Sequence, residues 1–240
     1  MQETAVVIGV SASRGLGAAI ARKFAAEGLH CVVAGRTAER LAEVTDEIQG
    51  AGGACSPCVT DATDARALSD LMTFAQGLGP VRAVIFNVGN NQPIAFDDLT
   101  AEQVEQFWRV CTLSAFLTAK AALPHLLDQG GSLLFTGASA SMRGRPGFAH
   151  FGAAKSALRN LAQALAKDYG PRGIHVGHVV VDGVINGERI RQHFSEYLDA
   201  LGEDGALEPD AIAAAYWQLH GQPRNAWTFE LDVRPYKETW

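Results

Sequence analysis

The sequence predicts an α/β fold in which a doubly wound, seven-stranded parallel sheet carries helices on both faces. Short runs rich in β-branched residues alternate with longer helical patterns, and this alternation is typical of a parallel sheet joined by crossover helices. A glycine-rich turn directly follows the first of these runs. The chain has 240 residues, of which 48% are hydrophobic, and this suits one large α/β domain with a sizeable core.

The expected strands are short and mostly apolar, and they are Ala5–Gly9, His30–Ala34, Ala54–Val59, Ala83–Asn87, Ser132–Thr136, His175–Val181 and Thr228–Val233. The expected helices carry apolar residues at helical spacing, and they are Leu16–Glu27, Ala38–Gln49, Ala65–Gly77, Ala101–Leu127, Phe151–Tyr169 and Pro209–His220. Thr100 and Gln103 have the spacing of a capping box at the fourth helix. Gly170-Pro171 predicts the end of the fifth helix.

The chain shows no repeat, low-complexity segment or linker, so residues 1–240 are expected to form one domain. Its least regular part is the segment 182–208, between the sixth strand and the last helix. Ligands of doubly wound sheets bind beyond the carboxyl ends of the strands. This segment is therefore a candidate substrate lid.

The composition argues against several classes of function. A net charge of −6 does not suit a nucleic-acid surface, which would need clustered lysine and arginine. The N-terminus lacks the pattern of a signal peptide, and no uninterrupted apolar stretch approaches a membrane span. We therefore expect a cytoplasmic protein that binds neither nucleic acid nor membrane. Cys55 and Cys58 have C-x-x-C spacing but fall in an expected strand with no second pair nearby, so reduced thiols are expected and no metal site.

The turn between the first strand and the first helix is a candidate phosphate-binding loop, and it reads Gly9-Val-Ser-Ala-Ser-Arg-Gly-Leu-Gly17. Its glycines would let the backbone approach a pyrophosphate, whose charge the helix N-terminus stabilises. Arg14 lies at that N-terminus, where a cation opposes the helix dipole unless an anion is near. After the second strand, Ala34-Gly35-Arg36 offers no carboxylate that would repel a phosphate. A turn without a ligand and two solvated arginines are the alternatives.

A second pattern opens the fifth helix, where Phe151 and Lys155 are four residues apart and so lie on one helical face. With the glycine-rich turn, Asp61 after the third strand and Asn87-Val-Gly89 after the fourth, this pattern resembles the short-chain dehydrogenase/reductase family. The resemblance extends over nearly the whole chain. It implies a Rossmann-type sheet and hydride transfer between a nicotinamide cofactor and a carbonyl or alcohol.

The resemblance also implies which residues bind the cofactor. Ser11 falls where the family has the first glycine of its Gly-x-x-x-Gly-x-Gly turn, and Gly15 and Gly17 match the other two. Arg14 and Arg36 match positions at which NADP-dependent members carry basic residues, so NADP(H) is favoured over NAD(H). Asp61 would contact the adenine, cap the next helix, or do both. The expected cofactor-binding residues are Gly9, Ser11, Ser13, Arg14, Gly15, Leu16, Gly17, Arg36, Asp61, Ala62, Asn87, Gly89, Lys155 and Gly183.

Three of the four catalytic residues that the resemblance implies are replaced. The family's tyrosine, which transfers the proton, corresponds to Phe151, its serine to Ala138 and its asparagine to Cys111. Only Lys155, which binds the nicotinamide ribose in the family, is retained. A phenyl ring delivers no proton, and positioned general acid–base catalysis contributes on the order of 10²–10⁴-fold.

Other side chains are candidates for the missing roles. Ser139 and Ser141 lie one and three residues beyond the serine position, and a small loop shift would bring either hydroxyl to the substrate. His150 adjoins Phe151 but is expected to point about 100° away around the helix. Cys111 is a nucleophile or a core thiol. Asp182 replaces a proline usual in the family, and it is either a new acid or a loop cap.

These observations leave two main hypotheses. The first is an NADP(H)-dependent oxidoreductase with a degenerate catalytic tetrad, acting on an unidentified small-molecule substrate such as an iminium or an activated alkene. The second is a noncatalytic NADP(H)-binding sensor or structural protein, and a scaffold that binds no dinucleotide is a third. The resemblance implies a homodimer or homotetramer packed through the fourth and fifth helices, which are rich in alanine and leucine and suited to close packing.

Overall fold

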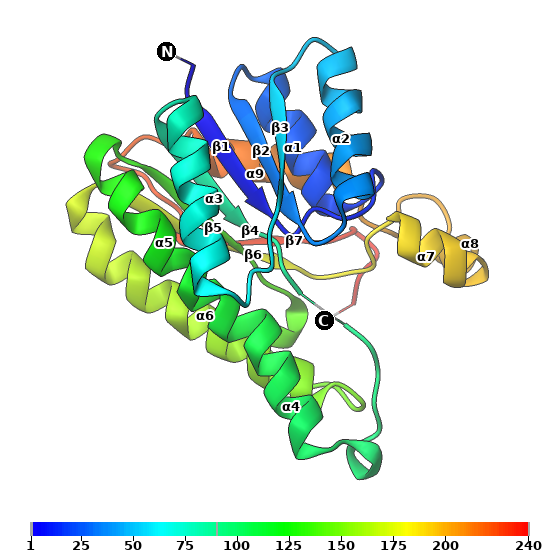
Figure 1. Cartoon of the computed structure of the whole chain (residues 1–240). Coiled ribbons are helices and arrows are strands. Elements are labelled where there is room, and N and C mark those ends of the chain that lie inside the picture. The colour runs from blue at the N-terminus through cyan, green and yellow to red at the C-terminus, as the bar shows by residue number, and fades with distance from the viewer. Residues whose placement is uncertain (1, 90, 240) are drawn as a thin grey trace.

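A computed structural model describes residues 2–89 and 91–239 of the chain. Over these residues the strands form a seven-stranded parallel sheet in the order β3-β2-β1-β4-β5-β6-β7 (Figure 1). The strand order reverses between β1 and β4, as in a doubly wound sheet, so the predicted fold class is confirmed. The strands are β1 (Thr4–Ile8), β2 (His30–Gly35), β3 (Cys55–Val59), β4 (Val81–Phe86), β5 (Gly131–Thr136), β6 (Ile174–Val181) and β7 (Glu230–Val233).

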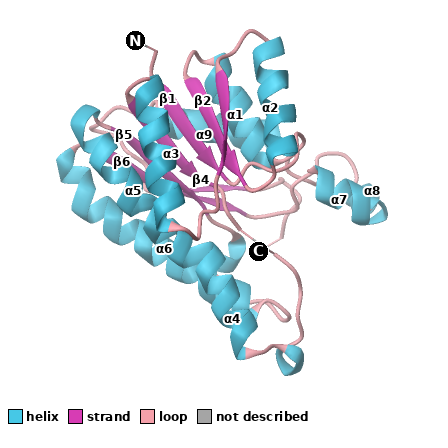
Figure 2. Ribbon diagram, viewed as in Figure 1, coloured by secondary structure: helices cyan, strands magenta, loops and turns pink. Residues whose placement is uncertain are grey.

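Helices cover both faces of the sheet (Figure 2) and enclose two apolar cores with it. Residues of β6 are buried along the whole strand, because a parallel sheet covered on both faces exposes neither side of its central strands. The helices of one face are α1 (Leu16–Ala26), α2 (Ala38–Gly50) and α9 (Pro209–His220), and those of the other are α3 (Ala65–Leu78), α5 (Ser114–Gln129) and α6 (Ala149–Tyr169).

One expected helix is interrupted. The segment Ala101–Leu127 was expected to be continuous, but a π-helical turn at Arg109–Leu113 divides it into α4 (Ala101–Trp108) and α5. Within this turn Thr112 Oγ1 donates to the carbonyl of Ala154 in α6, at 2.8 Å. The spacing of apolar residues does not predict a hydrogen bond from a side chain to a neighbouring helix. Such π turns are frequent at functional sites, and this one holds Cys111.

Side chains cap two of the helices. Thr100 Oγ1 accepts from the backbone nitrogen of Gln103 at 3.3 Å, and Gln103 Oε1 accepts from that of Thr100 at 2.9 Å, so the predicted capping box is confirmed. At α3 the cap is Asp64, which accepts from the backbone nitrogen of Arg66 at 2.8 Å. The alternative role of Asp61 as the cap of this helix is therefore wrong.

The candidate lid, 182–208, is more regular than expected. It contains α7 (Glu188–His193) and α8 (Ser195–Leu201), which project from the body of the molecule (Figure 1). At its base Ile185 pairs with Leu207 in a short parallel bridge. This pairing closes the segment into a loop whose two ends are held together.

One stretch, Ala101–Gln129, is long and apolar enough by length and composition to cross a membrane, contrary to the expectation from sequence. It comprises α4, the π turn and α5. Half of its most apolar window is buried inside the fold, where α5 contacts α3 and α4 contacts α6. A buried core helix passes the same test, so the apolar composition of this stretch is accounted for in part by packing.

Candidate functional site

The glycine-rich turn after β1 joins the ends of three strands. Gly9 has a φ of +95°, and a Cβ atom there would lie 2.6 Å from the backbone carbonyl carbon of Asn87. Asn87 Nδ2 donates to the carbonyl of Gly9 at 3.2 Å, and Thr136 Oγ1 donates to Asn87 Oδ1 at 3.0 Å. Asn87 thus ties the ends of β1, β4 and β5. Glycine at position 9 therefore allows both the positive φ and the close approach of the Asn87 backbone.

Lys155 extends from α6 into this junction. Its Nζ donates to the carbonyl of Thr136 at 2.8 Å, and a Cβ atom on Gly89 would lie 3.4 Å from Nζ. The side chain is 3% exposed. Burial lowers the pKa of Lys155 from its ordinary value, and interaction with Cys111 partly opposes this shift. Lys155 and the Gly89 backbone are therefore neighbours at the end of the sheet.

The three positions expected from the resemblance to have lost catalytic groups meet in one apolar cluster beside Lys155. Phe151 and Cys111 are buried in this cluster with Phe107, and Ala138 packs against it. Lys155 Nζ lies 5.8 Å from the centroid of the Phe151 ring, within the range of a cation–π contact. Groups that would be polar in the resembled family are here apolar and packed on one another. The Cys111 thiol is fully buried, in agreement with the core-thiol alternative.

The neighbouring serines lie in a 3₁₀ turn, Ser139–Ser141, that follows β5. Ser141 Oγ accepts from the backbone nitrogen of Ala138 at 3.2 Å, and Ser141 is buried. Its hydroxyl therefore shapes the loop that presents the serine position. Ser139 is half-buried at the start of this turn.

His150 is buried rather than presented to solvent. Its ring packs edge-on against Phe107 with centroids 4.2 Å apart, and its Nε2 lies 3.2 Å from the carbonyl oxygen of Gln92. The imidazole thus anchors the segment after β4 to α6. His150 thus contacts Phe107, which belongs to the same apolar cluster as Phe151.

Asp182 lies at the end of β6 and is 2% exposed. Arg143 Nη2 donates to both of its carboxylate oxygens, at 2.9 and 3.0 Å. Arg234 Nη2 lies 3.4 Å from the second of them. The carboxylate is therefore held between two guanidinium groups and joins the loop after β5 to the C-terminal segment. These ion pairs give Asp182 a structural contact that differs from the loop cap considered from the sequence, and neither arginine was predicted from sequence.

The adenine end of the expected cofactor site lies beyond β2 and β3. Asp61 accepts from the backbone nitrogen and the hydroxyl of Thr63, at 2.9 and 2.8 Å. These hydrogen bonds, with a smaller contribution from the charge of Arg36, lower the pKa of Asp61. Ala62 is buried, whereas Arg36 and Arg14 are exposed. The fold therefore brings Asp61 and Arg36 near each other.

The rest of the turn is tightly packed. Ser13 Oγ donates to Glu47 of α2 at 2.5 Å. Gly15 precedes the first residue of α1, and Leu16 is buried. A Cβ atom on Gly17 would lie 2.8 Å from a backbone carbonyl of the turn. These contacts hold the loop closely against the start of α1.

Gly183, the last of the expected cofactor-binding residues, follows Asp182 and has a φ of +152°. A Cβ atom there would lie 2.7 Å from Cδ of Pro235. The C-terminal segment therefore lies directly against the base of the lid.

A cavity of about 300 Å³ opens beside the turn. Side chains of three segments line it, and they are Ser11, Ala12, Thr37, Arg40, Glu188, Arg189, Gln192 and His193. Arg14 and Arg36 are not among them. Sequence reasoning missed Arg40, which lies in the first turn of α2 four residues beyond Arg36, and it missed the contribution of α7. This cavity joins the expected phosphate-binding turn to the lid.

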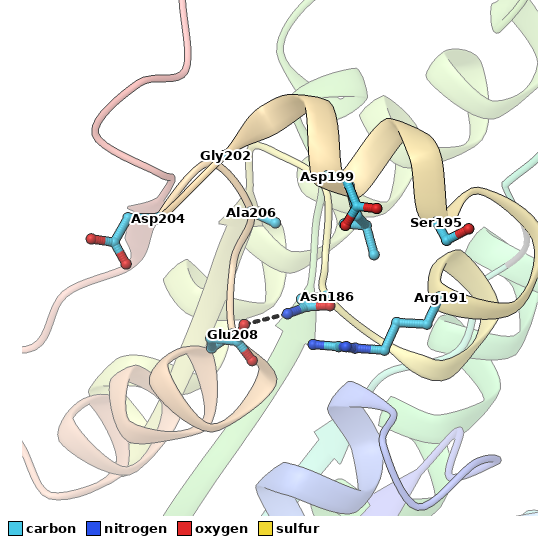
Figure 3. Close-up of a pocket in the computed structure, with 9 residues that line it drawn as sticks. Asn186, Arg191, Ser195, Asp199, Gly202, Asp204, Ala206 and Glu208 are labelled. Carbon is cyan, nitrogen blue, oxygen red and sulfur yellow. Dashed lines mark hydrogen bonds between the residues drawn. The ribbon is translucent and has the colours of Figure 1, made fainter.

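A second cavity, of about 270 Å³, lies within the lid itself (Figure 3). Asn186 points into it and donates to Glu208 at its edge. Its lining residues are Asn186, Arg191, Ser195, Leu198, Asp199, Gly202, Asp204, Ala206 and Glu208. None of these comes from the turn or from α6, so this cavity belongs to the lid and not to the expected site.

A comparison with known protein families identifies the family of this chain. A family model described as short chain dehydrogenase matches residues 3–197. The chain belongs to the short-chain dehydrogenase family. The match includes the turn, the Lys155 helix and most of the lid, so membership in this oxidoreductase family rests on the segments that build the site.

Relatives of this short-chain dehydrogenase include meso-2,3-butanediol dehydrogenase of Serratia marcescens, 31% identical over 216 residues that cover 87% of this chain and 84% of that protein. A short-chain dehydrogenase crystal structure from Rhodopseudomonas palustris has 34% identity and a TM-score of 0.84, covering 98% of this chain and 99% of that one. An NADPH-bound short chain oxidoreductase from Pseudomonas aeruginosa, containing an atypical catalytic center, shares the fold at 20% identity, with a TM-score of 0.87 and coverage of 98% and 96%.

Proposed function

We propose that this protein is an NADP(H)-dependent oxidoreductase whose small-molecule substrate accepts or releases a hydride without a phenolic proton donor. One observation carries the proposal. Lys155, Thr136, Asn87 and Gly9 form a connected hydrogen-bonded junction at the cofactor turn, while the adjacent proton-transfer position is the phenyl ring of Phe151. This junction supports cofactor binding, and the phenyl ring supports a reaction that needs no phenolic acid.

The preference for NADP(H) is supported by charge. Arg36, Thr37 and Arg40 follow β2, and no carboxylate precedes Glu39 there to bind the ribose 2′-hydroxyl of NAD(H). Arg14 is exposed at the N-terminal end of α1, where an anion would offset its unfavourable interaction with the helix dipole. The P. aeruginosa protein of the same fold has been solved with NADPH bound.

In this proposal the chain's own residues bind, orient and exclude water. When bound, the nicotinamide would supply or take up a hydride. Lys155 would hold the ribose hydroxyls through its ammonium group, whose position the Thr136 carbonyl sets at 2.8 Å. Phe151 and Cys111 would present an apolar wall to the substrate. Such a wall suits a substrate that is already electrophilic enough to accept a hydride, such as an iminium ion or an alkene conjugated to a carbonyl.

A second candidate function is noncatalytic binding of NADP(H) for sensing or assembly. The observation that favours it is the joint replacement of three polar groups by Phe151, Ala138 and Cys111, which pack together as core residues do. A protein of this kind would bind the cofactor and turn over no substrate.

The first experiment is a fluorescence titration of the purified protein with NADPH and, separately, with NADH. We expect tighter binding of NADPH, because the basic residues at the adenine end would contact its 2′-phosphate. Failure to bind either dinucleotide would overturn both candidate functions and leave a fold retained for another purpose.

The second experiment separates the two candidates. Reduction of ketones, cyclic imines and conjugated alkenes is followed by NADPH absorbance for the wild type and for a Phe151→Tyr, Ala138→Ser double variant. We expect the wild type to reduce an imine or alkene, and the double variant to gain ketone reduction by roughly 10²-fold through the restored hydroxyls. Ketone reduction by the variant alone, with NADPH bound by both proteins, would favour the noncatalytic function.

We further propose that the protein forms a homodimer or homotetramer through the surface of α4, α5 and α6. Val104, Trp108 and Phe116 are large apolar residues exposed on α4 and α5. Exposed apolar side chains gathered on neighbouring helices are typical of an interface.

A further inference from the structure

The carboxylate of Glu188 lines the cavity beside the expected cofactor turn. Thr37 and Arg40 come from the segment after β2, where doubly wound proteins contact the adenosine ribose, and Ser11 comes from the turn, where they bind the pyrophosphate. The opposite wall is α7 of the lid, which contributes Glu188 and Arg189. A ligand group in this cavity would therefore touch the lid as well as the turn.

Glu188 forms an ion pair with Arg40 on the opposite side of the cavity. Arg40 Nη1 donates to Glu188 Oε1 at 3.0 Å, and Gln192 Nε2 donates to the same oxygen at 3.2 Å. The Glu188 side chain is 20% exposed, and that of Arg40 is 43% exposed. Desolvation on this scale strengthens a charge-assisted hydrogen bond relative to one in open water. The pair therefore links the lid to the nucleotide end of the site.

The lid segment is also anchored on the turn itself. Gly187, the residue before Glu188, lies close enough to the turn that a Cβ atom there would be 3.2 Å from the carbonyl of Arg14. This contact keeps the Glu188 backbone beside the cavity. Glu188 is thereby presented from the lid to Arg40, in the segment that follows β2.

A carboxylate in this place acts oppositely on the two dinucleotides. The ribose of NAD(H) carries a 2′-hydroxyl, which donates to a carboxylate. The ribose of NADP(H) carries a 2′-phosphate, which a carboxylate repels and for which Arg40 is the natural partner. In the structure Glu188 already occupies Arg40, so a phosphate would have to replace it there.

We propose that Glu188 of the lid limits the preference for NADP(H), by competing with the 2′-phosphate of NADP(H) for Arg40 and by accepting from the 2′-hydroxyl of NAD(H). The inference rests on the proposed function, because it assigns a discriminating residue to the same dinucleotide site. It also couples the cofactor to the lid, since exchange of partners on Arg40 releases α7 from α2.

The test measures dissociation constants of NADPH and NADH by fluorescence titration for the wild type and for Glu188→Gln. We expect the variant to bind NADPH roughly three- to tenfold more tightly and NADH more weakly, since a half-buried charge pair of this kind contributes modestly. Titration with 2′,5′-ADP and 5′-AMP by calorimetry isolates the adenosine end. The variant should bind 2′,5′-ADP more tightly and 5′-AMP no more tightly.

Glu43→Gln is the matched control. Glu43 Oε2 also lies near Arg40, at 3.8 Å, but its side chain is 50% exposed on α2 and does not line the cavity. This variant should leave the NADPH-to-NADH ratio at the wild-type value. Melting temperatures of both variants establish that they are folded.

The outcomes separate the inference from the function on which it rests. Binding of both dinucleotides with an unchanged ratio in Glu188→Gln overturns the role of Glu188 and leaves the proposed function standing. An equal change of the ratio in Glu43→Gln also overturns it, because a general charge effect would then suffice. Absence of binding in the wild type and in both variants overturns the proposed function together with the inference.

Discussion

At the scale of single residues, Lys155 places an ionisable group in a buried position that disfavours its charge. Its ammonium group is almost fully buried, with the Thr136 carbonyl as a hydrogen-bond acceptor, beside an apolar cluster. Burial disfavours the charged form of a lysine and lowers its pKa. Polar groups held at such a cost to stability are typical of functional sites, where binding and not folding has shaped the choice of residue.

Replacing Lys155 by methionine should therefore stabilise the protein and weaken cofactor binding. We expect the free energy of unfolding to rise by about 1–3 kcal/mol at pH 7, because a buried polar group without full hydrogen bonding is removed. NADPH affinity should fall by roughly tenfold with the loss of a charge-assisted hydrogen bond to the ribose. Urea unfolding and fluorescence titration measure the two effects.

The effect of Lys155→Met on the free energy of unfolding should depend on pH. The pKa of Lys155 is lower in the folded than in the unfolded protein, so the unfolded state binds more protons between the two values and stability rises with pH there. The stabilising effect of Lys155→Met should shrink as the pH rises from 7 toward 10. Lys167→Met, an exposed lysine of the same helix, is the control, and an equal effect there would contradict the burial argument.

At the scale of elements, the end of β5 is fixed by the strand beside it. Gly137 follows β5, and a Cβ atom there would lie 2.3 Å from Nε2 of His178 in β6. His178 is fully buried, and burial lowers its pKa to about 4. Its Nδ1 lies 3.0 Å from Glu230 of β7, which Arg159 of α6 binds through two nitrogens at 2.6 and 2.9 Å. The ring therefore has little freedom to move.

Gly137→Ala should lower the free energy of unfolding by about 1–3 kcal/mol, because the added methyl group overpacks a region that cannot relax. The control is Gly144→Ala in the following loop, where a Cβ atom would meet nothing within 4 Å. That change should be neutral or slightly stabilising. Chemical denaturation compares the two variants, and equal stabilities would show that the His178 ring can move aside.

At the scale of the whole molecule, the apolar surface is unevenly distributed. The stretch from α4 to α5 is apolar enough to pass a membrane-span criterion, yet only half of its most apolar window is buried. Trp108 and Phe116 are each 43% exposed on it. A second copy of the chain packed on this surface would cover both side chains, which is the basis of the proposed oligomer.

A Trp108→Glu, Phe116→Glu double variant should therefore shift the protein toward the monomer, because two charges would be buried in the proposed interface. Sedimentation velocity on wild type and variant measures the change. Phe74→Glu is the matched control, since Phe74 is 42% exposed but lies on α3. A wild type that sediments as a monomer at all concentrations would rule out the oligomer.

The sequence by itself determined the features that depend on local spacing. The alternation of apolar runs predicted the sheet and nearly every helix, because strand and helix periods repeat over a few residues. The pair Phe151 and Lys155 was predicted to share a helical face for the same reason, and both contribute to the site. The family also followed, since the glycine turn and the lysine helix are short, contiguous motifs.

Only the tertiary structure decided which distant side chains meet. Thr112 of the π turn bonds to Ala154, 42 residues away, and the pairing of Glu188 with Arg40 joins residues separated by 148 positions. Asp182 could have been an acid until its two arginine partners were placed around it. The burial of a side chain, its ion pairs and its pKa depend on the residues that folding brings next to it. A local sequence pattern does not identify those residues.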